Sequence, residues 1–136
     1  MIRVPCVAII IENRQGEILL LLRDDKPSIP FPNYWTLVGG KVEEGETPES
    51  AAHREMLEEI GFDTVINFWK RYDRQHPCVL VDQMIYLANI DLPSGALTLR
   101  EGQDVRFFNF NGINNLNIGF EFGTLLEEYF SSRKTD

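Results

Sequence analysis

Residues 40–62 read GKVEEGETPESAAHREMLEEIGF, and this stretch decides the fold that we expect of the whole chain. Its second half predicts a helix over residues 48–60. Thr47 suits the N-cap and Pro48 the first helical position, while Gly61 suits the left-handed conformation that ends many helices. The sequence therefore marks both ends of a helix that carries most of the acidic residues of the stretch.

Three glutamates share one face of this helix. Glu55, Glu58 and Glu59 are three and four residues apart, so at about 100° per residue they fall on the same side. Arg54 is the only lysine or arginine within residues 42–62. Hard cations such as Mg²⁺ and Mn²⁺ prefer oxygen ligands, and uncompensated carboxylates supply them. The cluster favours a metal site, with an ordinary acidic helix surface as the alternative.

The spacing of these residues resembles the Nudix box of the Nudix hydrolase family, in its MutT-like branch. That box is written GX5EX7REUXEEXGU, where U is a bulky apolar residue, and residues 40–62 meet every specified position. The specified positions are occupied by Gly40, Glu46, Arg54, Glu55, Met56, Glu58, Glu59, Gly61 and Phe62. The similarity extends through the approach from Trp35 and the order of strands to most of the chain.

The resemblance implies an α/β (α+β) fold, an αβα sandwich with a mixed central sheet and a catalytic loop-helix-loop. It also implies metal-dependent hydrolysis of a phosphoanhydride bond, with Mg²⁺ or Mn²⁺ as cofactor. The implied metal ligands are the Gly39 carbonyl, Glu55, Glu58 and Glu59. The residues implied to stabilise the loop are Gly40, Glu46, Arg54 and Gly61, with Arg54 pairing with Glu46. Val38 stands where the family often has proline, which removes no ligand.

The resemblance also implies a further glutamate ligand from a later loop, and Glu101 resembles that position, with an ordinary acidic loop residue as the alternative. The implied catalytic residues are Arg54, Glu55, Glu58, Glu59 and Glu101. Cations that clamp the phosphates lower the pKa of a bound water, and a nearby carboxylate can take its proton. Glu55 and Glu101 are both candidates for this general base. His53 and His76 are available as well, but a lone histidine is more often structural or solvated.

Outside the box, the sequence predicts strands followed by a second helix. Three prolines make residues 24–33 an exposed loop. A final amphipathic helix is expected over residues 120–132, with Leu125, Leu126, Tyr129 and Phe130 buried. Strands are expected over residues 4–12, 17–23, 35–38, 64–72, 79–90 and 105–110. This order favours a layered α/β or α+β domain.

The 136 residues suit one domain, residues 1–136, and 43% are hydrophobic. A net charge of −8 argues against direct nucleic-acid binding, although bound cations let an acidic pocket take an anionic ligand. The apolar runs are far below the ~20 residues that span a bilayer, and no secretory signal is seen, so we expect a cytoplasmic protein without a membrane partner. Cys6 and Cys78 are expected to be buried free thiols rather than a disulfide. The family resemblance makes a homodimer possible.

The box specifies chemistry at phosphate and leaves the attached group open. The candidates for substrate binding are Arg23, Phe31, Tyr34, Trp35, Trp69 and Tyr72. We expect a small-molecule nucleotide, either a (d)NTP or a modified nucleoside triphosphate. Pro77, fifteen residues after Phe62, keeps ADP-ribose or a nucleotide sugar as an alternative substrate. A non-catalytic nucleotide-binding regulatory module is the alternative of another class, and the retention of every glutamate in the box favours an enzyme.

Overall fold

Seven strands form one mixed sheet in the computed structural model, which describes residues 2–133. They are β1 (Ile2–Glu12), β2 (Ile18–Leu22), β3 (Trp35–Thr36), β4 (Val38–Lys41), β5 (Asn67–His76), β6 (Val79–Asn89) and β7 (Asp104–Phe108). Strand β1 is central, because β2 and β4 pair with it antiparallel and β6 pairs with it in parallel. The order is β3-β2-β1-β6-β5, and β7 pairs with β2.

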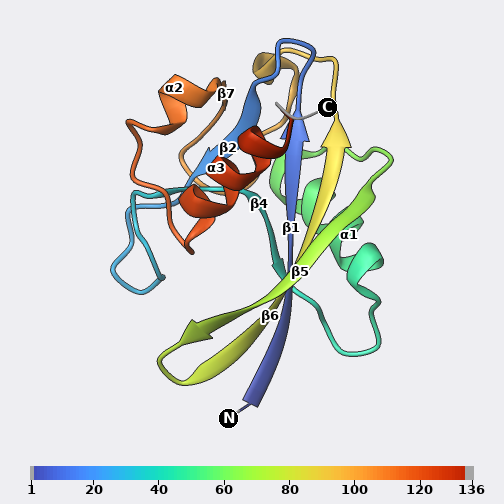
Figure 1. The fold of residues 1–136 in the computed structure, drawn as a ribbon, viewed down its shortest axis with the longest axis vertical. Helices are drawn as coiled ribbons and strands as arrows, with labels where there is room; N and C mark the ends of the chain where they lie inside the picture. Colours follow the sequence, from blue (N-terminus) through green and yellow to red (C-terminus); the bar gives the residue numbers. More distant parts are fainter. Residues whose placement is uncertain (1, 134–136) are drawn as a thin grey trace.

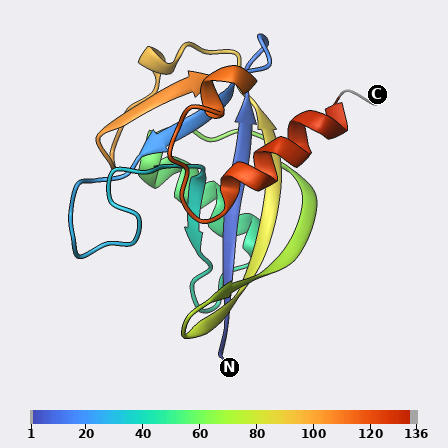
Figure 2. The ribbon, with the colours of Figure 1, turned by 60° about the vertical axis from the view of Figure 1, so that its left-hand side comes forward.

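Helices cover both faces of this sheet. Figures 1 and 2 show α1 (Pro48–Ile60) on one side of β1 and α3 (Phe122–Arg133) on the other. The short helix α2 (Phe110–Ile113) follows β7, and a 3₁₀ turn (Ser94–Ala96) precedes that strand. None of the helices within residues 2–133 is long and apolar enough to cross a membrane. The expected αβα arrangement around a mixed sheet is confirmed.

The continuous apolar run of β1 is explained by burial on both faces. Val7, Ile9 and Ile11 pack in the cluster that contains α1, whereas Ala8 and Ile10 pack in the cluster that contains α3. All five side chains are at most 2% exposed. A strand covered on both faces needs no polar side, which is why the sequence shows no alternation here.

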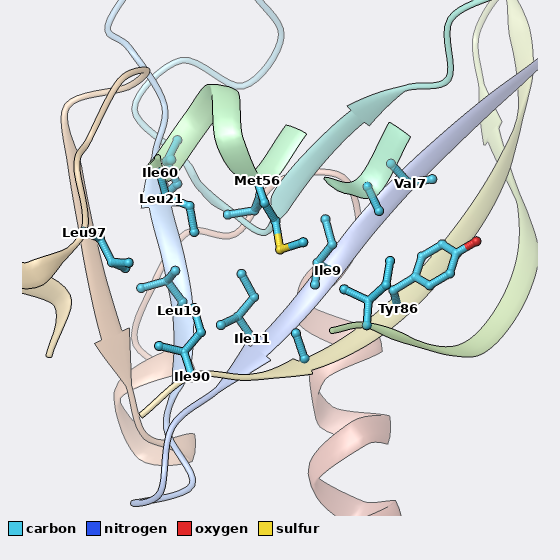
Figure 3. Packing of buried hydrophobic residues seen from close by; sticks show 14 of the residues in the cluster. Val7, Ile9, Ile11, Leu19, Leu21, Met56, Ile60, Tyr86, Ile90 and Leu97 are labelled. Carbon is cyan, nitrogen blue, oxygen red and sulfur yellow. The ribbon is translucent and has the colours of Figure 1, made fainter. Parts of the chain in front are cut away.

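Helix α1 is held to the sheet by a separate apolar stripe. Met56 and Ile60 are fully buried and pack with Ile9, Ile11 and Leu21 in one cluster (Figure 3). The carboxylates of the same helix therefore lie beside this contact and do not form it.

One predicted strand is divided in the structure. Leu37 separates β3 from β4, and β4 continues through the two glycines to Lys41. The break arises because β3 pairs with β2, whereas β4 pairs with β1. The prediction of a single strand over residues 35–38 was wrong, and the correction places Gly39 and Gly40 inside the sheet. The other predicted strands are present with shifted ends.

The final helix starts later than predicted. Phe120 and Glu121 have φ values of +60° and +62°, which are left-handed and interrupt helical geometry before Phe122. The predicted burial of Leu125, Leu126, Tyr129 and Phe130 is confirmed. Helix α2 was not predicted.

The two cysteines are free thiols, as expected. Cys6 is partly buried in β1. Cys78 is exposed, because it lies in the turn between β5 and β6. The expectation that both thiols are buried was therefore wrong.

The apolar stripe of α1 gives a first prediction. Met56→Ala should lower the free energy of unfolding by about 2–5 kcal/mol, because it leaves a cavity where the side chain now fills the core. Leu57→Ala, on the next residue and 47% exposed, should change it by less than about 1 kcal/mol. Urea unfolding of the metal-free protein measures both, and equal losses would contradict the packing described.

Candidate active site

Helix α1 is fixed at both ends by the residues that the sequence marked. The Thr47 hydroxyl accepts a hydrogen bond from the Ser50 amide at 3.1 Å. Gly61 has a φ of +65° and donates its amide hydrogen to the Leu57 carbonyl at 3.1 Å. These caps set where the helix begins and ends, and therefore which side chains face β4.

Two carboxylates of α1 are buried against the glycines of β4. Glu55 and Glu59 are 9% and 5% exposed. The Gly39 amide donates to Glu59 Oε2 at 3.0 Å. A Cβ atom on Gly40 would lie 2.6 Å from Glu55 Oε1, far inside van der Waals contact. The approach of the carboxylates therefore depends on the missing side chain at residue 40.

The burial of these groups is reflected in their protonation. Burial raises the pKa of Glu59 well above its ordinary value, and a hydrogen bond with Glu55 raises it further. Burial also raises the pKa of Glu55, although the hydrogen bonds from Glu59 and Arg54 oppose the rise. Both shifts have the same origin, because two adjacent buried carboxylates disfavour full ionisation of the pair.

Arg54 links the loop before α1 to the glutamates. Its Nε and Nη2 donate to the two oxygens of Glu46 at 2.7 and 3.0 Å, and Nη2 also donates to the Lys41 carbonyl at 3.0 Å. Its Nη1 donates to Glu55 at 2.8 Å and to Glu58 at 3.1 Å. The hydrogen bond with Glu46 raises the pKa of Arg54, and Arg54 in turn lowers the pKa of Glu46. The forked guanidinium thus joins the loop to the acidic face of the helix.

The donor set has the chemistry of a site for a hard divalent cation. Glu55, Glu58 and Glu59 offer carboxylate oxygens, and the space that a Gly40 side chain would fill holds one of these carboxylates. Within residues 2–133, no three acidic, histidine or cysteine side chains are grouped tightly enough to hold an ion together. Arg54 Nη1 donates to both Glu55 and Glu58, so these two carboxylates share one cationic partner. The residues fit a cation by the chemistry of their oxygen donors.

The remaining titratable candidates lie around this cluster. Glu101 is exposed in the loop before β7, and its charge contributes to the raised pKa of Glu59. His53 lies 2.5 Å from an Asp63 carboxylate oxygen, which gives it a structural partner. His76 lines the cavity described next.

A cavity of about 330 Å³ adjoins the buried glutamates. Glu59, Gly39 and Gly40 form its wall on the side of α1 and β4, and residues of β1, β5 and β6 also line it. Its volume lies at the lower end of the range for small-molecule sites. The cationic side chains that line it are Arg23, Lys41 and Arg74. These cationic side chains suit an anionic ligand.

Of the six predicted substrate contacts, Arg23 lines this cavity. Phe31 and Tyr34 form an aromatic pair at 5.3 Å, and Phe31 also packs on Phe120 at 4.7 Å. Neither Phe31 nor Tyr34 lines the cavity, but Phe31 contacts Phe120, which does line it.

The other three predicted contacts pack within the α3 side of the molecule. Trp35 contacts Phe108 at 4.8 Å and Trp69 contacts Tyr129 at 5.4 Å between ring centroids. Burial raises the pKa of Tyr72 to about 12, as expected of a phenol in the core. Trp35, Trp69 and Tyr72 are not among the residues that line the cavity.

Gln83, Arg74 and Phe120 are among the lining residues that the sequence analysis missed. Gln83 is 1% exposed in β6, Arg74 is 9% exposed in β5, and Phe120 precedes α3. A polar residue in the apolar run of β6 was the signal for Gln83. Arg74 and Phe120 carried no such signal, because only the pairing of distant segments brings them together.

Comparisons with known proteins agree with this geometry. A family model described as the NUDIX domain matches residues 2–126. The 8-oxo-dGTP diphosphatase of Haemophilus influenzae is 38% identical over 102 residues, which cover 70% of this chain and 68% of that protein. An RNA pyrophosphohydrolase of Wolbachia pipientis is 48% identical over 59 residues, which cover 43% of this chain and 33% of that protein. The matched part thus spans only about a third of the latter relative.

Among solved structures, the MutT protein of Methanosarcina mazei has the same fold. It superposes with a TM-score of 0.84 at 21% identity, over 98% of this chain and 96% of that one. Members of the family are generally dependent on a divalent metal, which agrees with the oxygen donors of α1. With the family model matching nearly the whole described chain, the protein belongs to the Nudix hydrolase family.

Proposed function

We propose that this protein hydrolyses a phosphoanhydride bond of a (d)NTP or a modified nucleoside triphosphate, with Mg²⁺ or Mn²⁺ as cofactor. The observation that carries the proposal is the buried pair Glu55 and Glu59, of which Glu59 lines a cavity that Arg23, Lys41 and Arg74 also line. Buried carboxylates that are only partly compensated favour a bound cation, and the cavity beside them has room for the nucleoside. The similarity to an 8-oxo-dGTP diphosphatase supports a triphosphate as substrate.

The side chains divide the work between holding a cation and placing the substrate. Glu55, Glu58 and Glu59, together with the Gly39 carbonyl, would hold the divalent ion. When bound, that ion supplies the positive charge that neutralises phosphate oxygens and activates water. Arg54 would orient its neighbouring glutamates and secure the loop without touching substrate.

Proton removal from the attacking water needs a free carboxylate. Glu55 already accepts from Arg54 at 2.8 Å and is hydrogen-bonded with Glu59. Glu101 is exposed and close enough to influence the charge of Glu59. We therefore assign the general base to Glu101.

The test of the proposed function is release of phosphate or pyrophosphate from a panel of nucleotides with Mg²⁺. The wild-type protein should hydrolyse triphosphates. Glu58→Gln or Glu59→Gln should lower kcat/KM by about a hundredfold or more, because mutation of residues that merely hydrogen-bond to metal ligands already lowers metal affinity or activity by about 10–100-fold. Glu49→Gln, exposed on the first turn of α1, is the matched control and should retain activity.

Three outcomes of the nucleotide panel would contradict the proposal. If the pure protein hydrolysed no nucleotide, it would not be an enzyme of this class, and a non-catalytic regulatory module would be the remaining interpretation. Hydrolysis confined to ADP-ribose or nucleotide sugars would replace the substrate class. Equal activity of wild type and Glu59→Gln would show that the glutamates do not hold the metal.

The raised pKa of Glu59 predicts how stability depends on pH in metal-free protein. A carboxyl whose folded pKa exceeds its unfolded pKa stabilises the fold below the unfolded value, and the contribution is lost as pH rises through the folded pKa. The Tm in chelator should therefore fall between weakly acidic and alkaline pH. Glu59→Gln should flatten this fall and raise the Tm at alkaline pH. Thermal melts of both proteins from pH 5 to pH 9 measure it, and parallel curves would contradict the assignment.

Arg54 gives a test of the loop. Arg54→Lys keeps the charge but loses the fork that spans Glu46 and the Lys41 carbonyl, so it should cost about 1–3 kcal/mol of unfolding free energy. Arg14→Lys, with a side chain 78% exposed, should cost nothing measurable. Urea unfolding compares the two. If Arg54→Lys were as stable as wild type, the loop would be held by other contacts.

A further inference from the structure

We propose that Gln83 and Arg74 select nucleobases whose buried edge presents carbonyl oxygens, a 6-oxopurine or a 4-oxopyrimidine, over bases that present an amino group there. This proposal rests on the proposed function, because it assigns the base-reading part of the same site. It adds a specificity that neither the Nudix box nor the metal ligands contain.

The first observation is a pair of buried donors without partners. Gln83 is 1% exposed and Arg74 is 9% exposed, and both line the cavity. Within residues 2–133, neither Gln83 Nε2 nor Arg74 Nε has a hydrogen-bond partner. Unpartnered buried polar atoms are rare in folded proteins, since each forgoes its bonds to water. Two of them at one cavity point to a ligand that completes them.

The two side chains share a face of the β5–β6 hairpin. Arg74 pairs with Val81, and Gln83 lies two residues further along β6, so both side chains project from the same side of the sheet. Cys6 of β1 is aligned with Gln83 and lines the cavity as well. The two donors therefore lie on the same wall of the cavity, which β5 and β6 form and which we call its floor. Figure 1 shows this hairpin beside β1.

The chemistry of these donors sets the selectivity. Arginine carries five N–H donors and no acceptor, so only an acceptor on the ligand satisfies it. The unpartnered atom of Gln83 is likewise a donor. A carbonyl oxygen of the base can accept hydrogen bonds from both side chains, whereas an amino group would face their N–H donors with donors of its own. A site built for hydrogen bonds rejects an analogue that cannot make them.

Phe120 supplies a flat wall for the same ligand. Its ring lies under the guanidinium groups of Arg23 and Arg74, with centroid distances of 4.9 and 5.5 Å. Its φ of +60° is uncommon for a bulky residue, and its side chain lines the cavity. Phe120 with the Arg23 guanidinium stacked on it would offer a flat surface that packs against any base, and the edge of the base would be left to Gln83 and Arg74.

A contact between Arg74 and phosphate is the rival interpretation. Cationic Arg23 and Lys41 also line the cavity. A phosphate contact would act on all nucleotides alike, whereas an edge contact acts on the difference between two bases. Matched substrates separate the two.

The experiment measures kcat/KM with Mg²⁺ for ITP against ATP and for UTP against CTP, since each pair differs by a carbonyl or an amino group at one ring position. Wild type should favour the carbonyl member of each pair by about tenfold in kcat/KM, which corresponds to a free-energy difference of ~1.4 kcal/mol. Gln83→Met, of similar length and without donors, should bring each ratio to within about threefold, mainly through KM. Gln75→Met, exposed on the same hairpin, should keep the wild-type ratios.

Each other outcome overturns the proposal. Equal rates for the members of a pair in wild type, or an equal loss for both members in Gln83→Met, would mean that the floor does not read the base, while the proposed function stands. A uniform loss in Arg74→Met would assign that side chain to phosphate. If nothing is hydrolysed, the proposed function fails, and calorimetric binding of IMP against AMP still decides selection. Equal affinities there would overturn it.

Discussion

The close approach of helix α1 to the glycines of β4 is the constraint on which the site depends. Glu59 accepts the Gly39 amide at 3.0 Å, and Glu55 fills the space that a side chain on Gly40 would occupy. The apolar contact of Met56 with β1 fixes the helix at this depth. A larger residue at position 40 would push the carboxylate away, and with it the face of the helix that borders the cavity.

This approach places negative charge where water is scarce, and the neighbouring residues limit its cost. Arg54 compensates Glu55 and Glu58 and ties them to Glu46, whereas Glu59 accepts from the Gly39 amide and is hydrogen-bonded with Glu55. A hydrophobic pair would make a more stable helix contact. Carboxylates at the contact between α1 and β4 therefore lower the stability of the fold, as is common where residues serve binding.

Local signals in the sequence predicted the helix and its chemistry, but not the cavity. Thr47 and Gly61 marked the ends of α1, and their capping roles depend only on neighbouring residues. The division of residues 35–38 into β3 and β4 depends on two different partner strands, so no local pattern revealed it. The cavity brings together β5, β6 and the segment before α3. Arg74 and Phe120 become neighbours only through that non-local pairing.

The central claim is that the carboxylates of α1 bind a divalent cation. Titration of the protein with Mn²⁺, followed by electron paramagnetic resonance of the free ion, tests it without any choice of substrate. Wild type should remove Mn²⁺ from solution, and Glu59→Gln should bind it much more weakly while keeping its fold. Equal binding by the two proteins, or no binding by wild type, would contradict the account.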